Sequence, residues 1–206
     1  MPVIFTSRYR ARPGEEAAFL AVAQQCVESP AEWPTGASEA RLFQSLDDPG
    51  DLLFLSEWER REAFDSNLAG SAAIAALWGL ALGPPRRHCF ELLRCVRHLG
   101  RRVATGACAL VSAPPAEQAA TRAFMLEALA SFEAAPQLVT VYVAQDLDDP
   151  THFLGFAGWQ SEAALQAFLQ DLLPPWMAAL WRQGVRVDLF AGLVRANGEA
   201  LASTVS

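Results

Sequence analysis

The alternation of hydrophobic and polar residues predicts four strands and two helical regions in the first half of the chain. Apolar residues spaced two apart are typical of strands, and apolar residues spaced three or four apart are typical of helices. Turn residues such as Pro13-Gly14 and Pro49-Gly50 separate the segments. In chain order the predicted elements are a strand at 3–9, a helix after Gly14, strands at 40–46 and 52–58, a helix from about 60 that continues as an Ala-rich segment to 78, and a strand at 88–96.

The second half repeats this pattern. Its predicted elements are a strand at 104–111, a helix at 117–133, strands at 138–146 and 153–159, a helix at 161–170, a short helix at 176–183 and a strand at 185–194. Pro174-Pro175 is interpreted as a break between the last two helices, because proline lacks the N–H that a helix interior needs.

The two halves are related by a gapless shift of 101 residues. Residues 46–49 recur at 147–150 as Leu-Asp-Asp-Pro, and the same shift places Trp58 on Trp159. A constant offset indicates one module present twice. We therefore expect two domains, at 1–99 and 100–206.

The order β-α-β-β-α-β in each copy predicts a ferredoxin-like α+β unit with both helices on one face of an antiparallel sheet. Residues 52–55 are all apolar, so both faces of that strand are expected to be covered. The sequence therefore predicts that the two copies pack sheet against sheet, as an intramolecular dimeric α+β barrel.

Composition excludes several classes of function. The net charge is −7 and every cation is Arg, which argues against a nucleic-acid partner and removes lysine chemistry. Four cysteines without CxxC spacing favour a reduced, cytoplasmic setting. The longest weakly polar run, 69–82, is too short to span a bilayer, so no membrane partner is expected. His88, His98 and His152 have no metal-ligand spacing, and neither a metal nor a cofactor is expected.

The Asp-Asp-Pro hairpin, the strand that ends at Trp58 and the following Glu62-Ala63-Phe64 resemble the antibiotic biosynthesis monooxygenase family. The resemblance implies two such domains in one chain, where most relatives pair two chains. It implies a function among cofactor-independent oxygenases of aromatic or quinol substrates, heme-degrading enzymes, signal-related proteins and members without activity. Such domains commonly carry a histidine nine residues after the strand-ending Trp, where this chain has Asn67 and Phe168.

Three residues of the first copy are candidates for catalysis. Glu57, whose counterpart is Gly158, could serve as a general base, with Trp58 and Asn67 orienting the substrate. The alternatives are a solvated carboxylate at Glu57, packing at Trp58 and an amide bonded to water or backbone at Asn67.

Glycine replaces bulkier residues in the second copy, where Gly155 and Gly158 stand at the positions of Phe54 and Glu57. Either a ligand or a neighbouring side chain must fill the space. The residues expected to contact a substrate are Phe54, Phe64, Trp78, Tyr142, Gly155, Trp159 and Phe168.

The sequence therefore favours a cofactor-independent monooxygenase that binds a small apolar or aromatic molecule. The alternative is a non-catalytic duplicated barrel that serves as a binding or interaction module. A further homodimer of the fused pair is possible in either case.

Overall fold

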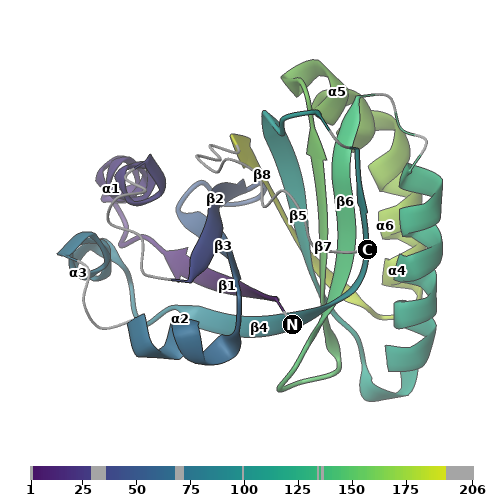
Figure 1. Ribbon diagram of the computed structural model, residues 1–206, viewed down its shortest axis with the longest axis horizontal. Coiled ribbons are helices and arrows are strands. Elements are labelled where there is room, and N and C mark those ends of the chain that lie inside the picture. Colours follow the sequence, from purple (N-terminus) through teal and green to yellow (C-terminus); the bar gives the residue numbers. More distant parts are fainter. Residues whose placement is uncertain are drawn as a thin grey trace.

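Within the part of the chain that the structure describes, eight strands close into one barrel with helices on its outside (Figure 1). This computed structural model describes residues 2–28, 36–67, 72–98, 100–133, 135 and 137–193, without the side chains at 66, 67, 72, 73 and 193. The elements of the first half are β1 (Val3–Arg10), α1 (Glu16–Glu28), β2 (Ala37–Ser45), β3 (Asp51–Trp58), α2 (Arg61–Asn67), α3 (Ala72–Leu80) and β4 (Arg86–Arg97). Those of the second half are β5 (Thr105–Ser112), η2 (Pro115–Glu117), α4 (Gln118–Phe132), β6 (Leu138–Asp146), β7 (His152–Trp159), α5 (Glu162–Ala167), η3 (Phe168–Leu172), α6 (Leu173–Arg182) and β8 (Arg186–Leu193).

The strand order around the barrel is β1-β3-β2-β8-β5-β7-β6-β4. It contains the ferredoxin-like order twice, as β4-β1-β3-β2 and as β8-β5-β7-β6, and all neighbouring strands are antiparallel. The predicted α+β fold, with two ferredoxin-like units closed into one barrel, is confirmed. The boundary expected at residues 99 and 100 falls in the connection between β4 and β5.

The two seams between the halves differ in extent. Strands β4 and β6 pair from Phe90 opposite Asp146 to Arg97 opposite Thr140. Among the described residues, strands β2 and β8 pair at Gln44 opposite Ala191 and at Ser45 opposite Phe190, and the Leu46 N–H donates to the Leu189 carbonyl at 3.1 Å. The first seam therefore carries most of the backbone hydrogen bonds that hold the barrel closed.

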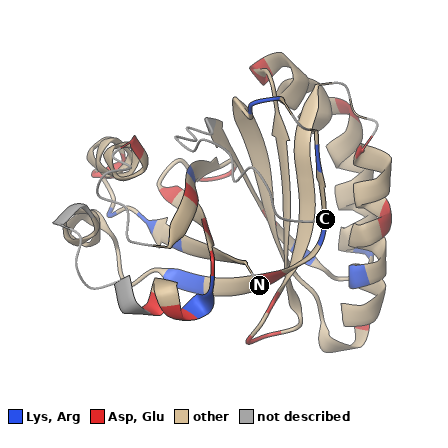
Figure 2. Ribbon diagram, in the orientation of Figure 1, with Lys and Arg blue, Asp and Glu red and all other residues tan. Residues whose placement is uncertain are grey.

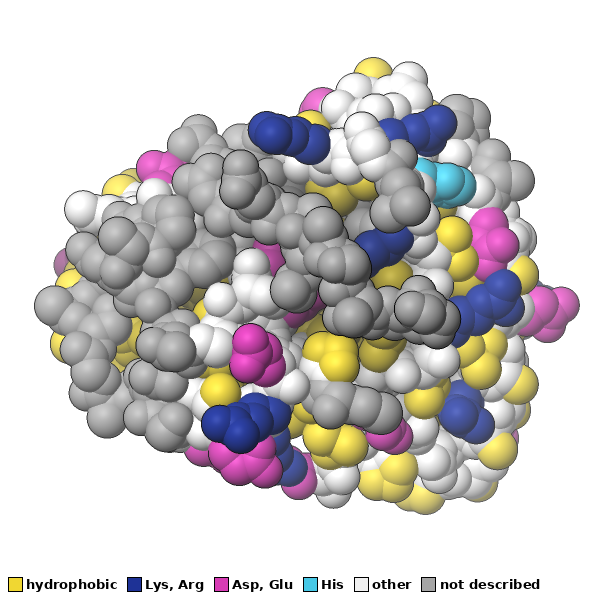
Figure 3. All heavy atoms as spheres, in the orientation of Figure 1, with side chains coloured by type: hydrophobic (Ala, Val, Ile, Leu, Met, Phe, Trp, Pro, Cys, Tyr) yellow, Lys and Arg dark blue, Asp and Glu magenta, His cyan; other side chains and the backbone are white. Residues whose placement is uncertain are grey.

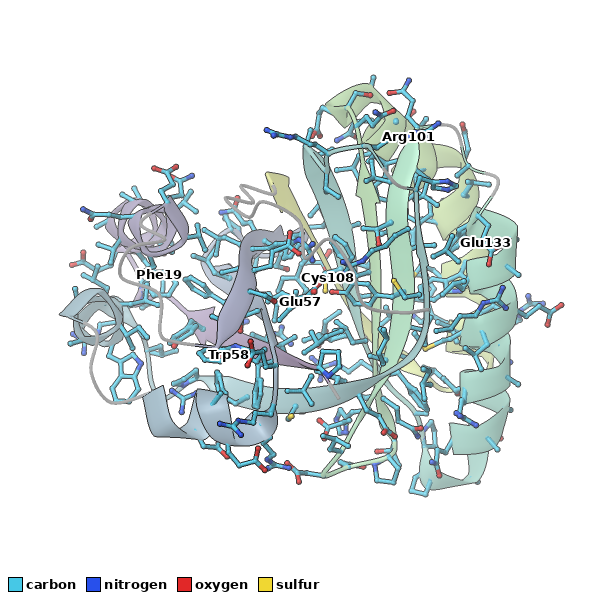
Figure 4. All side chains as sticks on the ribbon, viewed as in Figure 1. Phe19, Glu57, Trp58, Arg101, Cys108 and Glu133 are labelled. Atoms are coloured by element: carbon cyan, nitrogen blue, oxygen red, sulfur yellow. The ribbon has the colours of Figure 1, made fainter. Side chains whose placement is uncertain are left out.

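Closure buries the inward-facing side chains of both sheets in one core. The apolar cluster inside the barrel contains residues from both halves: Ile4, Phe43, Leu53, Leu55, Phe90, Cys108, Tyr142, Ala144, Leu154, Phe156 and Phe190. Separate clusters lie between each sheet and its own helices, with Phe19 of α1 fully buried in that of the first half. Figure 4 shows Phe19 among the outer helices, whereas Cys108 lies between the two sheets. The uncovered sheet face expected for a lone unit is thus covered by the other half.

The repeat is visible in side-chain contacts as well as in topology. Gln44 Nε2 donates to the carbonyl of Pro49 at 2.6 Å, and Gln145 Nε2 donates to the carbonyl of Pro150 at 2.7 Å. Each bond connects the turn to the strand before it, so the Leu-Asp-Asp-Pro hairpins of the two halves are stabilised by the same hydrogen bond.

The last helical region differs from the sequence prediction. Helix α5 continues through the π-helix η3 into α6, and Pro174 and Pro175 lie in the first turn of α6. The predicted break at these prolines is wrong, because residues in a first turn need no N–H partner within the helix.

Charged residues lie mainly on the outside of the molecule. Figure 2 shows most of them on helices, turns and strand ends, whereas the second sheet is largely uncharged.

Candidate functional site

A small apolar cavity lies in the second half, between the outer face of the sheet and helices α4 and α6. Its volume is about 50 Å³. Small side chains from three adjacent strands form its floor, and large ones from the helices form its roof. The lining residues are Ala107, Cys108, Ala109, Met125, Ala128, Leu129, Phe132, Val141, Tyr142, Val143, Gly155, Phe156, Ala157, Phe168, Leu173, Trp176 and Leu189.

Gly155 is one reason that space remains here. A methyl group added at this position would lie 3.5 Å from Met125 Cε, in ordinary contact. At the corresponding position of the first half, the ring of Phe54 occupies the sheet-helix layer and packs edge-on against Tyr9 at 5.5 Å between centroids. The space expected at Gly155 is therefore part of a cavity. At Gly158 it is filled by a neighbour, because an added methyl group would lie 2.6 Å from Val103 Cγ1.

The indole of Trp176 supplies an unused polar group at this cavity. Its Nε1 is buried and has no hydrogen-bond partner among the described residues. A buried donor without a partner is unfavourable by about 1–3 kcal/mol, so a ligand oxygen that accepts from it would be bound favourably. The sequence analysis missed Trp176, because the preceding prolines were interpreted as a break and the residue as part of a separate short helix.

The residues predicted to contact a substrate are divided between the halves. Tyr142, Gly155 and Phe168 line the cavity, and Trp159 lies beside it with its ring 4.6 Å from that of Phe168. The other three belong to the first half. Phe54 packs beneath α1 and α3, Phe64 stacks on Phe5, and Trp78 is 49% exposed.

The structure does not bring the predicted catalytic residues Glu57 and Trp58 together. Glu57 follows Leu53 and Leu55 on the face of β3 that points into the barrel, whereas Trp58 points to the helices, as successive residues of a strand do. Trp58 packs on Phe64, and its Nε1 donates to Ser56 Oγ at 2.8 Å. The side chain of Asn67 lies outside the described residues. Figure 4 shows Glu57 near the middle of the molecule and Trp58 nearer α2.

Glu57 belongs to a charged cluster at one end of the barrel interior. Arg41 lies between Glu57 and Glu39, with Nη1 3.3 Å from Glu57 Oε1 and Nη2 in contact with Glu39 Oε2. Arg97 Nη2 is 3.1 Å from Glu57 Oε2. The guanidinium of Arg41 also lies 4.6 Å from the centroid of the Phe156 ring. Both oxygens of Glu57 are thus occupied by cations.

Burial controls the proton equilibria of this interior. It raises the pKa of Glu39 above its usual value even though Arg41 lies beside it, and it raises the pKa values of Tyr142 and Cys108 more strongly. The phenol and the thiol therefore stay protonated at neutral pH. Neither is suited to act as a base in its present surroundings.

Neither a metal site nor a membrane-spanning helix is found among the described residues. No group of three or more His, Cys, Asp and Glu side chains there is arranged to hold a metal ion. No helix in that part of the chain is long and apolar enough to cross a membrane. On the face shown in Figure 3, charged and hydrophobic side chains are interspersed over the second half.

Comparison with known proteins agrees with this architecture. Residues 2–76 of the chain match the family model for antibiotic biosynthesis monooxygenase. Most of the first half thus matches an antibiotic biosynthesis monooxygenase (ABM) domain. The resemblance based on the hairpin and Trp58 is therefore confirmed, whereas the cavity lies in the second half, beyond the matched residues. A search of curated proteins finds no significant match.

Three solved structures share the fold over nearly the whole chain. A Fusobacterium nucleatum protein, provisionally called a monooxygenase, is 10% identical with a TM-score of 0.73 and covers 97% of this chain and 95% of its own. An anthrone oxidase-like protein is 14% identical with a TM-score of 0.67, covering 99% and 97%. A major regulator of staphylococcal pathogenesis is 12% identical with a TM-score of 0.55, covering 94% and 98%. At these identities the comparison shows the fold, and in each case a single chain supplies it throughout.

Proposed function

We propose that this ABM protein binds a small aromatic molecule in the cavity between the second sheet and helices α4 and α6, and oxygenates it. The cavity and the unpartnered donor Trp176 Nε1 on one of its lining residues carry the proposal; the hydroxyl of Tyr142, on a second lining residue, also has no hydrogen-bond partner among the described residues. An apolar lining with few polar groups is typical of sites for small organic molecules. A carbonyl or phenolic oxygen of the substrate would accept from the indole and fix its orientation.

Binding requires the cavity to open. About 150 Å³ is needed to hold a benzene ring, and the cavity has about 50 Å³. Met125 and Phe132 on α4 and Trp176 on α6 form the movable wall, and Met adapts readily because its side chain is flexible and unbranched. The π-helix η3 adjoins this wall, and such segments often lie at functional sites.

The proposed reaction needs no cofactor. A base removes a proton from an activated CH₂ group of the substrate, the resulting carbanion gives one electron to O₂, and the two radicals combine to form a carbon–oxygen bond. The peroxide takes up a proton and loses water as its O–O bond and the remaining C–H bond break, so that one oxygen atom stays in the product as a carbonyl and the other leaves as water. Glu57 is the base predicted from the sequence, but its carboxylate faces the barrel interior and is bound by Arg41 and Arg97, so it is the base only if the substrate binds inside the barrel. A substrate in the α4/α6 cavity would not touch it, so the two assignments can be separated by experiment.

The test compares W176F with E57Q in an assay of O₂ uptake with anthrone. If the cavity is the site, W176F raises the KM for anthrone about tenfold, the effect expected for one hydrogen bond of about 1.4 kcal/mol. E57Q then leaves the rate within about twofold, provided that its unfolding midpoint shows a folded protein. Loss of O₂ uptake in E57Q with W176F unchanged would place the reaction in the barrel interior and reject the cavity.

A second candidate function is a non-catalytic binding or interaction module. The small volume of the cavity favours it, because Met125, Phe132 and Phe168 already occupy most of the layer. The likeness in fold to a regulator of pathogenesis is compatible with such a role. Saturable quenching of tryptophan fluorescence by anthrone without O₂ consumption would favour the module over the enzyme.

A further inference from the structure

A larger, polar cavity of about 400 Å³ opens at the barrel end opposite the Arg41 cluster. It is formed where β1 ends and where β3, β4 and β8 begin. The lining residues are Arg8, Tyr9, Arg10, Asp51, Leu82, Gly83, Pro84, Arg86 and Arg186. Arg186 comes from the second half and the others from the first, so barrel closure creates this cavity.

The lining carries more positive than negative charge. Four guanidinium groups face one lining carboxylate, that of Asp51. Arg8 is fully engaged, because its Nε lies 3.0 Å from both oxygens of Asp51 and its Nη1 lies 2.6 Å from Asp188 Oδ2. Asp51 and Asp188 therefore fix the position of Arg8 and leave the other arginines to provide the excess charge.

The remaining three arginines are weakly engaged. Arg10 Nη2 is 3.2 Å from Asp48 Oδ2, and Arg186 Nη2 is 3.2 Å from Asp188 Oδ1, in both cases with largely exposed arginine side chains. Arg86 has no ion pair within the described ranges and lies directly opposite Arg8 in the β1–β4 register. An anion bound beside Arg86 would give this guanidinium the charged partner that it lacks.

We propose that this cavity binds the oxyanion group, carboxylate or phosphate, of a small organic molecule, with Arg86 and Arg186 as its principal ligands. A guanidinium presents two parallel N–H donors that match the spacing of oxygens in these groups. The volume lies within the range of small-molecule sites. Tyr9, Leu82 and Pro84 provide an apolar wall for the organic part of the ligand.

Such a ligand would also hold the two halves together. Arg186 begins β8, whose described pairing with β2 is short, and Arg86 begins β4 in the first half. A molecule bound to both arginines bridges the halves at the barrel end where this short seam lies. Because it binds the folded barrel alone, it raises the unfolding temperature as its concentration increases.

The experiment is calorimetric titration of the intact chain with phenyl phosphate, benzoate and inorganic phosphate in a chloride buffer. We expect saturable binding of phenyl phosphate or benzoate, with the tighter of the two identifying the preferred group and with inorganic phosphate weaker than phenyl phosphate. R86Q and R186Q should each weaken the tighter ligand at least tenfold. R122Q, which removes an exposed arginine from α4, is the matched control and should leave binding unchanged.

A gain of affinity provides an independent check. D48N removes the carboxylate charge that competes for Arg10, while its Asn Oδ1 can still accept from the Gly50 N–H of the turn, as Asp48 Oδ1 does at 2.9 Å. We expect about threefold or tighter binding in this variant. The proposal is overturned if neither organic anion binds below about 10 mM, or if R86Q and R186Q bind as R122Q does while all three variants unfold at the wild-type temperature.

Discussion

Replacing Arg41 with Met tests whether the charged cluster inside the barrel is held by one cation. The Arg41 side chain is 3% exposed, and it separates the carboxylates of Glu39 and Glu57, which are 18% and 14% exposed. Met retains most of the apolar volume of Arg but no charge. The substitution therefore leaves two largely buried carboxylates facing each other, with Arg97 as the cation that remains beside Glu57.

The expected loss of stability is about 3 kcal/mol at pH 7. Removing one partner of a buried ion pair typically costs about 3–5 kcal/mol, because the other charge stays buried without compensation. The lower end of this range applies, since Glu57 keeps its contact with Arg97. The triple variant R41M/E39Q/E57Q removes all three charges and should lie within about 1 kcal/mol of the wild type, as apolar or neutral replacements of buried ion pairs often do.

The measurement is urea unfolding followed by tryptophan fluorescence, repeated between about pH 5 and pH 8. Burial already raises the pKa of Glu39 in the folded protein, and removal of Arg41 raises it further. A carboxyl group with a raised folded pKa favours the fold while it is protonated, and this contribution is lost as the pH rises through that pKa. The deficit of R41M should therefore be largest near pH 8 and smaller near pH 5.

Two results would refute this reasoning. One is an R41M variant that loses less than about 1 kcal/mol at pH 7, which would mean that water already compensates the carboxylates. The other is a triple variant that is as unstable as R41M. Packing of the guanidinium on Phe156, and not charge compensation, would then be the main contribution of Arg41.

Two further predictions concern packing and thiol reactivity. In urea unfolding, G158A should lower the free energy of unfolding by about 1–3 kcal/mol, because the new methyl group meets Val103. G79A, in an open position of α3, should raise it by about 0.5–1 kcal/mol. Equal effects of the two substitutions would contradict the crowding at Gly158. Cys89 and Cys108 should resist iodoacetamide in the folded protein at pH 7.5 and react after denaturation, as followed by mass spectrometry. Burial raises the pKa of the Cys89 thiol to about 11 and that of Cys108 further, and rapid labelling of Cys108 in the native protein would show that the barrel opens.

The sequence alone determined the repeated unit and its order of elements. The offset of 101 residues, the Leu-Asp-Asp-Pro turns and the strand-ending Trp58 and Trp159 are local features, and hydrophobic periodicity places strands and helices within a few residues. Apolar residues on both faces of the strands also indicated barrel closure, since an antiparallel sheet with two apolar faces must be covered twice. It did not reveal that α6 begins before Trp176, because a proline in a first turn and a proline that breaks a helix look alike in sequence.

Only the tertiary structure decided which side chains lie together and where cavities are found. Glu57 and Trp58 are neighbours in sequence, but successive side chains of a strand point to opposite faces of the sheet. Once the barrel is closed, one face lies inside it and the other lies under the helices, so the two residues cannot line one pocket. The cavity at Gly155 brings together residues that are more than 25 positions apart in the chain. The polar cavity at Arg86 and Arg186 brings together residues that are about 100 positions apart. Such contacts depend on how sheets and helices pack in three dimensions, and local sequence patterns carry no record of that packing.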